Sequence, residues 1–418
     1  MPDLSRLYSD PTLQSLRAEC AAVTTGTAVS DVVEYRDGRT LQYVDLVMEG
    51  GGMLGIALLG YVHALESAGI RFLSVGGASA GSILSLLLAA CADRGEEKTP
   101  GLVDAVFGMN LASFVDGDDD ARDVSLLLAR TDVGRLEALW KGVQVIDNIT
   151  GDIGLNPGDA FCDWLDTLLR GYGTLTLADL DTRLQRNPAN LSLRGTGESL
   201  AGIQSELGIV AADLSTETKA VFPAMAPLYW ADPQRVSPAL FVRASMSIPF
   251  FFLPFRVHGV SKIPDVAARW SHIASYEGEI PDTTVFADGG LMSNFPISLF
   301  HAPGVPVAPT FGVKLGARGR RVHESISPLS YGANLFNAMR HYADFDFIAR
   351  NPDYKHLLGY IDTRGHNWLN FFMGEEEKWT LFRKGMTAGL SFLRSFKWEE
   401  YKQVRADLEA RKSEGRES

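Results

Sequence analysis

A serine between small residues is the first feature of the sequence that suggests chemistry. Ser79 stands in Gly77-Ala78-Ser79-Ala80-Gly81, a G-x-S-x-G pattern between an expected strand and an expected helix. A sharp strand-to-helix turn that presents a nucleophilic serine needs small neighbours on both sides. The helix after the turn directs unpaired N–H groups at the serine and favours developing negative charge. This context predicts that Ser79 is a nucleophile, with Gly77 and Gly81 supporting the turn.

A glycine-rich segment, Gly50-Gly51-Gly52-Met53-Leu54-Gly55, precedes this turn and allows two interpretations. As G-x-G-x-x-G it could bind a dinucleotide, but that function needs an acidic residue about 20 positions further on, at the end of the second strand. The second strand ends instead in Gly76-Gly77. The favoured interpretation is an oxyanion hole, in which the N–H groups of Gly50, Gly51 and Gly52 approach a negatively charged oxygen.

An aspartate in a glycine turn completes the candidate set. Asp288-Gly289-Gly290 follows an expected strand at 284–287. Taken alone, this is an Asx-turn that closes a strand. Together with the two glycine-flanked segments, it predicts that Asp288 is the base that serves Ser79. A free carboxyl with a pKa of about 4 is a poor base for an alcohol, so we expect Asp288 in a closed, partly dry pocket that raises its pKa.

The elements that would position these residues alternate between strand and helix. We expect strands at 43–48 and 72–75 and helices at 53–68 and 82–92, a βαβα unit with a parallel, buried sheet. One βα unit separates the glycine-rich segment from Ser79, so both should emerge side by side at one edge of the sheet. Further elements are expected as strands at 207–214, 219–222, 240–244 and 284–287 and as helices at 161–170 and 378–396.

In this order, the three motifs resemble those of the patatin-like phospholipases. Further matches are Leu155–Asp159 and Arg243–Pro249, and the resemblance runs from about Tyr43 to Leu315. It implies an α/β fold, a three-layer sandwich whose central, mostly parallel sheet carries helices on both faces. It also implies hydrolysis of lipid acyl esters without a metal or cofactor. By position, Ser79 and Asp288 would form a catalytic dyad and Gly50, Gly51 and Gly52 the oxyanion hole, with Gly55, Gly77, Gly81, Gly289 and Gly290 as supporting motif residues.

One position departs from the family's pattern. Members commonly carry Arg or Lys in the glycine-rich segment where this chain has Leu54. Loss of that cation leaves the backbone donors in place and affects the expected substrate preference more than the expected reaction.

Two other functions stay open at this point. An α/β-hydrolase with a Ser-Asp-His triad could use His301, His323, His341, His356 or His366, although its oxyanion loop and nucleophile are separated by more than one βα unit. The second alternative is a catalytically silent lipid-binding module. The favoured function is a serine lipid acyl hydrolase of the phospholipase A or lysophospholipase type.

The composition excludes other classes of protein. Hydrophobic residues make up 46% of the chain, enough for a sizeable core, and Lys+Arg 39 against Asp+Glu 51 gives a net charge of −12. This balance argues against nucleic acid as a partner, because its binding relies on clustered Lys and Arg. A lipid substrate and a local, apolar, peripheral contact with a membrane are expected instead. Three cysteines without CxxC spacing predict neither a disulfide framework nor a zinc site.

We expect one large domain with additions at both ends. Residues 43–315 are predicted to form the catalytic domain, 1–42 a peripheral segment, 316–404 a helical part packed on the same domain and 405–418 a charged, disordered tail. Met1–Ala21 is too polar for a signal peptide, and the apolar run Ile83–Ala92 is about half as long as a membrane span. A cytoplasmic, peripherally membrane-bound protein is expected; signal-less export and a protein activator or regulatory ligand stay open.

Overall fold

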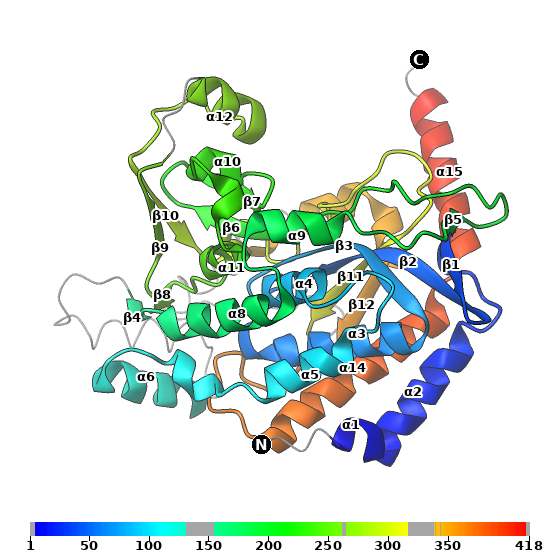
Figure 1. Ribbon diagram of the computed structural model, residues 1–418, viewed down its shortest axis with the longest axis horizontal. Helices are drawn as coiled ribbons and strands as arrows, with labels where there is room; N and C mark the ends of the chain where they lie inside the picture. Colours follow the sequence, from blue (N-terminus) through cyan, green and yellow to red (C-terminus); the bar gives the residue numbers. More distant parts are fainter. Residues whose placement is uncertain are drawn as a thin grey trace.

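A central sheet organises the chain (Figure 1). The computed structural model describes residues 5–130, 154–260, 265–316, 338, 340–342 and 344–414. The strands are β1 (Val32–Arg36), β2 (Arg39–Met48), β3 (Ile70–Ala78), β4 (Gly154–Asn156), β5 (Leu191–Leu193), β6 (Leu207–Asp213), β7 (Thr218–Phe222), β8 (Phe250–Phe252), β9 (Phe255–His258), β10 (Thr283–Ala287), β11 (Thr310–Leu315) and β12 (Leu358–Ile361).

The helices fall before, between and after these strands. The α-helices are α1 (Arg6–Ser9), α2 (Pro11–Val23), α3 (Gly55–Ser67), α4 (Ala80–Ala90), α5 (Thr99–Phe107), α6 (Asp119–Arg130), α8 (Asp159–Tyr172), α9 (Leu177–Leu184), α10 (Ala226–Tyr229), α11 (Pro238–Ser245), α12 (Val266–Ala274), α14 (Glu375–Ser395) and α15 (Trp398–Glu414). The 3-10 helices are η1 (Gly52–Leu54), η2 (Leu111–Phe114), η3 (Pro233–Arg235), η4 (Gly289–Leu291) and η5 (Pro352–His356).

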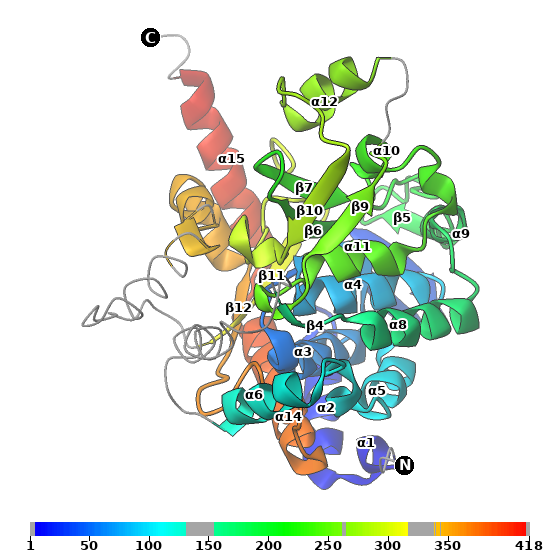
Figure 2. The same ribbon diagram turned by 90° about the vertical axis from the view of Figure 1, so that its left-hand side faces the viewer.

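The sheet is parallel at its centre and antiparallel toward one edge. Its main path runs β12-β11-β2-β3-β6-β10-β9, and the neighbours from β12 to β6 are all parallel. β10 and β9 follow in antiparallel orientation. Helices lie on both sides, as Figure 2 shows for α15 on one side and α4 and α8 on the other. The predicted α/β architecture with a central, mostly parallel sheet is confirmed.

The βα units at the centre follow the sequence pattern closely. β2, α3, β3 and α4 occupy the predicted positions, and every residue of β3 is buried, as expected of a strand covered on both faces. The predicted hairpin is present as β6 and β7, which pair antiparallel. The N-terminal segment contributes β1, which pairs with β2, and the segment 316–404 contributes β12, which pairs with β11.

Two predictions about secondary structure are wrong. The expected strand at 240–244 is helix α11, which starts after Ser237, whose side chain accepts the Ala239 N–H at 3.2 Å, with Pro238 in the first turn. Both are helix-start signals that outweigh a short apolar run. The charged tail is helical to Glu414, because Arg405 is buried and contacts Asp353 at 3.4 Å.

Helices α3 and α14 cross with their backbones in close contact. A Cβ on Gly385 would overlap the carbonyl oxygen of Ala57, and one on Gly60 would overlap that of Phe382. These glycines therefore set the position of α3, the helix that follows the glycine-rich segment.

Gly385→Ala is expected to lower the free energy of unfolding by about 1–3 kcal/mol, the usual cost of overpacking a core. Gly171→Ala is the matched control, since this helical glycine of α8 has nothing within 4 Å of its Cβ position. The control should leave stability unchanged or raise it by up to about 1 kcal/mol. Chemical denaturation measures both, and equal effects of the two substitutions would contradict the close crossing.

Candidate active site

Ser79 occupies a strained turn between β3 and α4. Its backbone has φ 50° and ψ −121°, an unusual conformation for a residue with a side chain. Two glycines make the turn possible, because a Cβ on Gly77 would lie 2.6 Å from the Met48 carbonyl oxygen and one on Gly81 would overlap the same atom. The Ser79 N–H donates to Ser245 Oγ at 2.9 Å, which anchors the turn to the end of α11.

The glycine-rich segment lies beside Ser79, as predicted. A Cβ on Gly50 would be 3.1 Å from the Ala78 carbonyl oxygen and 3.2 Å from Ser79 Cβ, so the two segments are too close for a side chain at Gly50. Gly50 exchanges two hydrogen bonds with Asn294, since its N–H donates to the Asn294 carbonyl oxygen at 2.9 Å and its own carbonyl oxygen accepts from Asn294 Nδ2 at 3.2 Å.

The Gly50 N–H, one of the three predicted oxyanion donors, is therefore already engaged with Asn294. Within the described part of the chain, the N–H groups of Gly51 and Gly52 have no such backbone acceptor. Leu54 is buried in η1, so the segment brings no positive side chain to the site. Gly55 packs against Ala80, where a Cβ would be 3.0 Å from that of Ala80.

Asp288 reaches Ser79 from an antiparallel strand. β10 pairs with β6 only through Phe286 opposite Asp213 and Ala287 opposite Ala212, and the chain then turns into η4. On the other side of β6, Ala78 is paired with Val210, which places Asp288 across β6 from the Ser79 turn. Gly289 permits the turn, because a Cβ there would overlap the Val210 carbonyl oxygen.

The Asp288 carboxyl is closed off from solvent, with 6% of the residue exposed. Burial raises its pKa above the ordinary value, while the charge of Arg340, the Ser79 hydroxyl and the Gly290 N–H oppose that rise. Oδ1 accepts the Gly290 N–H at 2.8 Å, and Oδ2 is buried without a well-aligned hydrogen bond from the described residues. The Ser79 hydroxyl is near enough to lower the pKa of this carboxyl but forms no well-aligned hydrogen bond with it, as is common for catalytic groups before substrate binds. The predicted closed environment is confirmed.

The two supporting motif blocks hold Asp288 in place. Arg243 donates to Ser247 Oγ at 2.7 Å and to the Pro157 carbonyl oxygen at 2.6 Å, which joins the blocks at 155–159 and 243–249. The Ser247 carbonyl oxygen then accepts the Asp288 N–H at 2.8 Å. Arg243 is 4% exposed, so these bonds compensate its burial.

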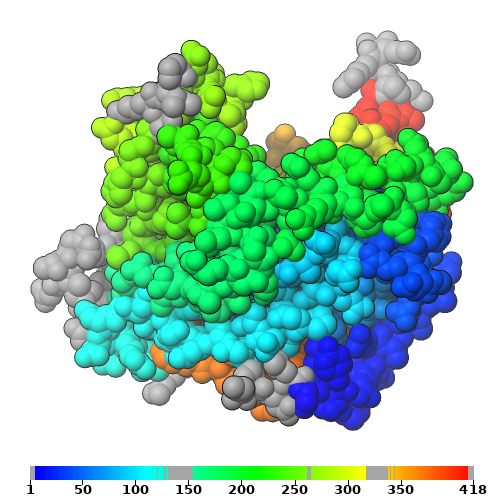
Figure 3. All heavy atoms as spheres, in the orientation of Figure 1, coloured from blue at the N-terminus to red at the C-terminus, as the bar shows by residue number. Residues whose placement is uncertain are grey.

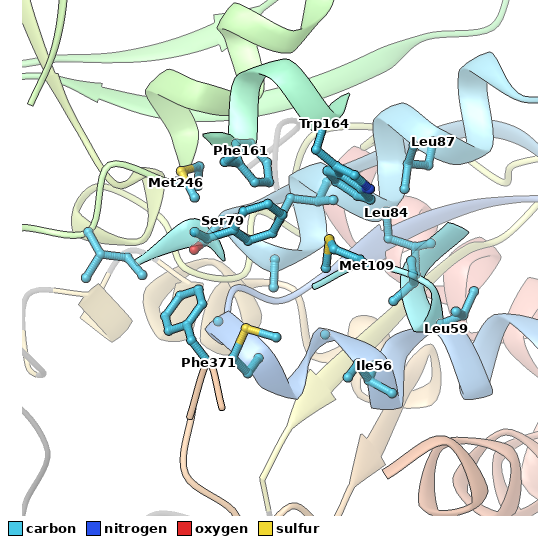
Figure 4. Close-up of a pocket in the computed structure, with 18 residues that line it drawn as sticks. Ile56, Leu59, Ser79, Leu84, Leu87, Met109, Phe161, Trp164, Met246 and Phe371 are labelled. Carbon is cyan, nitrogen blue, oxygen red and sulfur yellow. The ribbon is translucent and has the colours of Figure 1, made fainter. Parts of the chain in front are cut away.

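An apolar cavity begins at Ser79 and runs along α4 (Figure 4). Figure 4 places Ser79 at one end and Leu87 and Leu59 at the other. Eight residues of helix separate Ser79 from Leu87, so the cavity extends about 12 Å along α4. Its volume, including the open mouth, is about 710 Å³. The outer wall comes from Val106, Met109, Phe114, Phe161 and Trp164, in segments that form the cyan and green surface of Figure 3.

Four of the five histidines of the alternative triad lie in the described residues, and partners are seen for three of them. His301 Nδ1 lies 2.7 Å from the Tyr354 hydroxyl, and His366 Nδ1 lies 3.0 Å from Glu377. His341 packs its ring against Phe345, and His356 ends η5. His323 lies outside the described residues.

Metal ligands and membrane-spanning helices were sought in the described ranges. No group of three or more His, Cys, Asp or Glu side chains with metal-binding geometry occurs among those residues. No helix in the same ranges is long and apolar enough to cross a membrane.

A serine in a strained turn, a buried aspartate and a glycine-rich loop therefore lie together on a mostly parallel α/β sheet. A family model described as patatin-like phospholipase matches residues 46–301, and the chain belongs to this family. The family assignment supports lipid acyl hydrolysis as the general class of activity.

Two individual proteins are also similar to this chain. The protein YqhO of Bacillus subtilis, described as uncharacterized, is 28% identical over 357 residues, which cover 85% of this chain and 99% of YqhO. The crystal structure of VipD from Legionella pneumophila matches 88% of this chain and 70% of its own with a TM-score of 0.42 and 15% identity.

Sequence reasoning missed three residues of the site. Asn294 and Arg340 lie outside the motifs, and Ser245 was included only as part of a matching block. A serine in the chain between the Ser79 turn and Asp288 is only a weak sequence signal of a site residue. Its role becomes visible once α11 is placed against Ser79.

Ser245→Ala is expected to slow the reaction of the protein with a serine-directed fluorophosphonate by about tenfold, since the Ser79 N–H loses its acceptor. Ser85→Ala is the control, because Ser85 is a buried serine of α4 that donates to the Gly81 carbonyl oxygen. Labelling reactions that are quenched at successive times and analysed by intact-protein mass spectrometry give the labelling rates of both variants. Equal rates in the two variants would remove Ser245 from the support of the turn.

Proposed function

We propose that the protein is a serine lipid acyl hydrolase of the phospholipase A or lysophospholipase type, with Ser79 and Asp288 as a catalytic dyad. One observation carries the proposal: Ser79 stands at the end of a long apolar cavity and beside a buried carboxyl that is held by two supporting motif blocks. A fatty acyl chain fits such a cavity, because its lining is almost entirely hydrocarbon and polar groups occur near Ser79.

In the first half of the reaction, Ser79 Oγ attacks the acyl carbonyl carbon while Asp288 accepts the hydroxyl proton. The carbonyl oxygen becomes negatively charged and receives hydrogen bonds from the Gly51 and Gly52 N–H groups. The bond to the leaving alcohol then breaks, and Asp288 returns its proton to that oxygen. The products are an acyl-serine ester and a lipid that has lost one chain.

In the second half, water replaces the alcohol. Asp288 accepts a proton from the water as its oxygen attacks the acyl-serine carbonyl, and the same N–H groups hold the oxyanion. Release of Ser79 Oγ, which takes the proton back from Asp288, yields a free fatty acid. The raised pKa of Asp288 suits it to both directions of proton transfer.

The expected partner is a lipid aggregate or membrane approached from its surface. The net charge of −12 and the buried Leu54 provide no electrostatic attraction to anionic headgroups near the glycine loop. Affinity for the substrate then depends on the acyl chain, whose transfer into the cavity contributes about 0.8 kcal/mol per buried CH₂.

Ser79→Ala and Asp288→Asn are each expected to fold and to lose at least about 100-fold in hydrolysis of a short acyl ester, because nucleophile and base are removed. Ser85→Ala and Asp45→Asn are matched controls; Asp45 is a half-buried acid of β2 whose pKa is raised by desolvation to about 7. Ester hydrolysis and mass spectrometry of a treated lipid extract measure the loss.

Each alternative function has its own outcome in this experiment. An alanine variant of one of the triad candidates that folds but is as inactive as Ser79→Ala would establish a triad in place of the dyad. These candidates are His301, His323, His341, His356 and His366. Wild-type protein that binds lipid but releases no fatty acid would establish a silent binding module.

Leu87→Phe is expected to change the preferred chain length, because a larger side chain fills the far end of the cavity. The ratio of kcat/KM for a decanoyl ester to that for a butyryl ester should fall by about tenfold. Leu88→Phe is the control, since Leu88 is equally buried on α4 but does not line this cavity. The same fall in both variants would place the acyl chain elsewhere.

A further inference from the structure

Arg340 joins the glycine loop and the buried acid although it belongs to neither motif. Its Nη2 donates to Asn294 Oδ1 at 2.6 Å. Asn294 is the residue that exchanges two hydrogen bonds with Gly50. The guanidinium thus orients the amide that fixes the start of the oxyanion loop.

The same guanidinium lies close to the carboxyl of Asp288. A Cβ on Gly290 would be 2.6 Å from Asn294 Oδ1, 2.7 Å from Asp288 Oδ1 and 3.2 Å from Arg340 Nη2. These three polar atoms therefore surround one point above the glycine. Any side chain at that position would separate the cation from both of its neighbours.

A positive charge at this position stabilises the ionised form of Asp288. Asp288 is buried, and burial without a nearby cation favours the protonated carboxyl, which is unable to accept a proton from Ser79. The glycine-rich segment from Gly50 to Gly55 has no charged side chain. Among the described residues, Arg340 is the one whose charge acts on Asp288.

We propose that Arg340 is a positioning residue that holds Asn294 against the oxyanion loop and keeps Asp288 ionised. The inference rests on the proposed function, because it gives Arg340 its role through the base of the dyad. Arg340 lies beyond the residues 46–301 that match the family model, so the C-terminal part of the chain completes the site.

Charged groups on the neighbouring elements of the site have their own partners. Arg243 on α11 is bound to Ser247 and Pro157, and Lys314 on β11 pairs with Glu49 at 2.7 Å. Asp213 on β6 accepts from Thr216 at 2.7 Å. Two more groups need controls: His341, which follows Arg340, and Asp344, which accepts from Ser293 and the Phe295 N–H and whose pKa burial raises to about 6.

The test is the pH dependence of kcat/KM for a butyryl ester in wild type, Arg340→Met and Arg340→Lys. Removal of the cation raises the pKa of Asp288, and the base works only when deprotonated. In the pH profile of kcat/KM, the acid limb is the part where activity rises as the base loses its proton. In Arg340→Met the midpoint of this limb should move up by about one pH unit, so that activity falls most at low pH and recovers partly at high pH. Arg340→Lys keeps the charge and should keep the limb near its wild-type position.

Three controls test whether the acid limb reports the ionisation of Asp288. Arg350→Met removes an exposed arginine that pairs with Asp346 at 3.0 Å, and it should leave the whole profile unchanged. His341→Gln should leave the limb in place. In an Asp344→Asn background, Arg340→Met should still shift the limb, because Asp344 is then unable to titrate.

The outcomes separate this inference from the proposed function. Loss of activity at all pH values with an unmoved limb, or an equal shift in Arg340→Lys and Arg340→Met, would overturn the role of Arg340. If Arg340→Met does not fold, the limb in Arg340→Lys and Arg340→Gln decides the same question. Wild-type protein without any Ser79-dependent hydrolysis would instead overturn the proposed function.

Discussion

The backbones of β2 and of the turn around Ser79 lie so close together that no side chain fits between them. The Met48 carbonyl oxygen occupies the space that a Cβ of Gly77 or Gly81 would need, and a Cβ on Gly50 would be crowded against Ser79 Cβ at 3.2 Å. This contact forces Ser79 into its strained conformation and brings the glycine loop to it. The N-terminus of α4 and the cavity along that helix then follow from where the turn lies.

The second constraint is electrostatic, because the site contains a carboxyl from which water is excluded. Burial makes Asp288 a better proton acceptor but also favours the form that accepts no proton. A base in this position therefore needs a nearby cation. Arg340 meets this requirement through Asn294, which ties the charge state of the acid to the geometry of the glycine loop.

Much of the fold was predictable because its signals are local. The periodicity of the β2-α3-β3-α4 unit and the small residues around Ser79 depend only on nearby sequence, and the family resemblance followed from the same residues. The individual hydrogen bonds and strand pairings between distant segments were not predictable. The occupied Gly50 N–H depends on Asn294, and the approach of Asp288 depends on β10 running antiparallel to β6 for only two residue pairs. The error at α11 came from giving an apolar run more weight than its Ser-Pro start.

The central claim is that Ser79 attacks an acyl ester whose chain lies in the cavity along α4. The most direct measurement is a crystal structure of the protein after reaction with a long-chain alkyl fluorophosphonate. The account predicts phosphorus bonded to Ser79 Oγ, the phosphoryl oxygen within hydrogen-bond distance of the Gly51 and Gly52 N–H groups, and the alkyl chain beside Leu84 and Leu87. A bond to another residue, or a chain that lies outside the cavity, would contradict it.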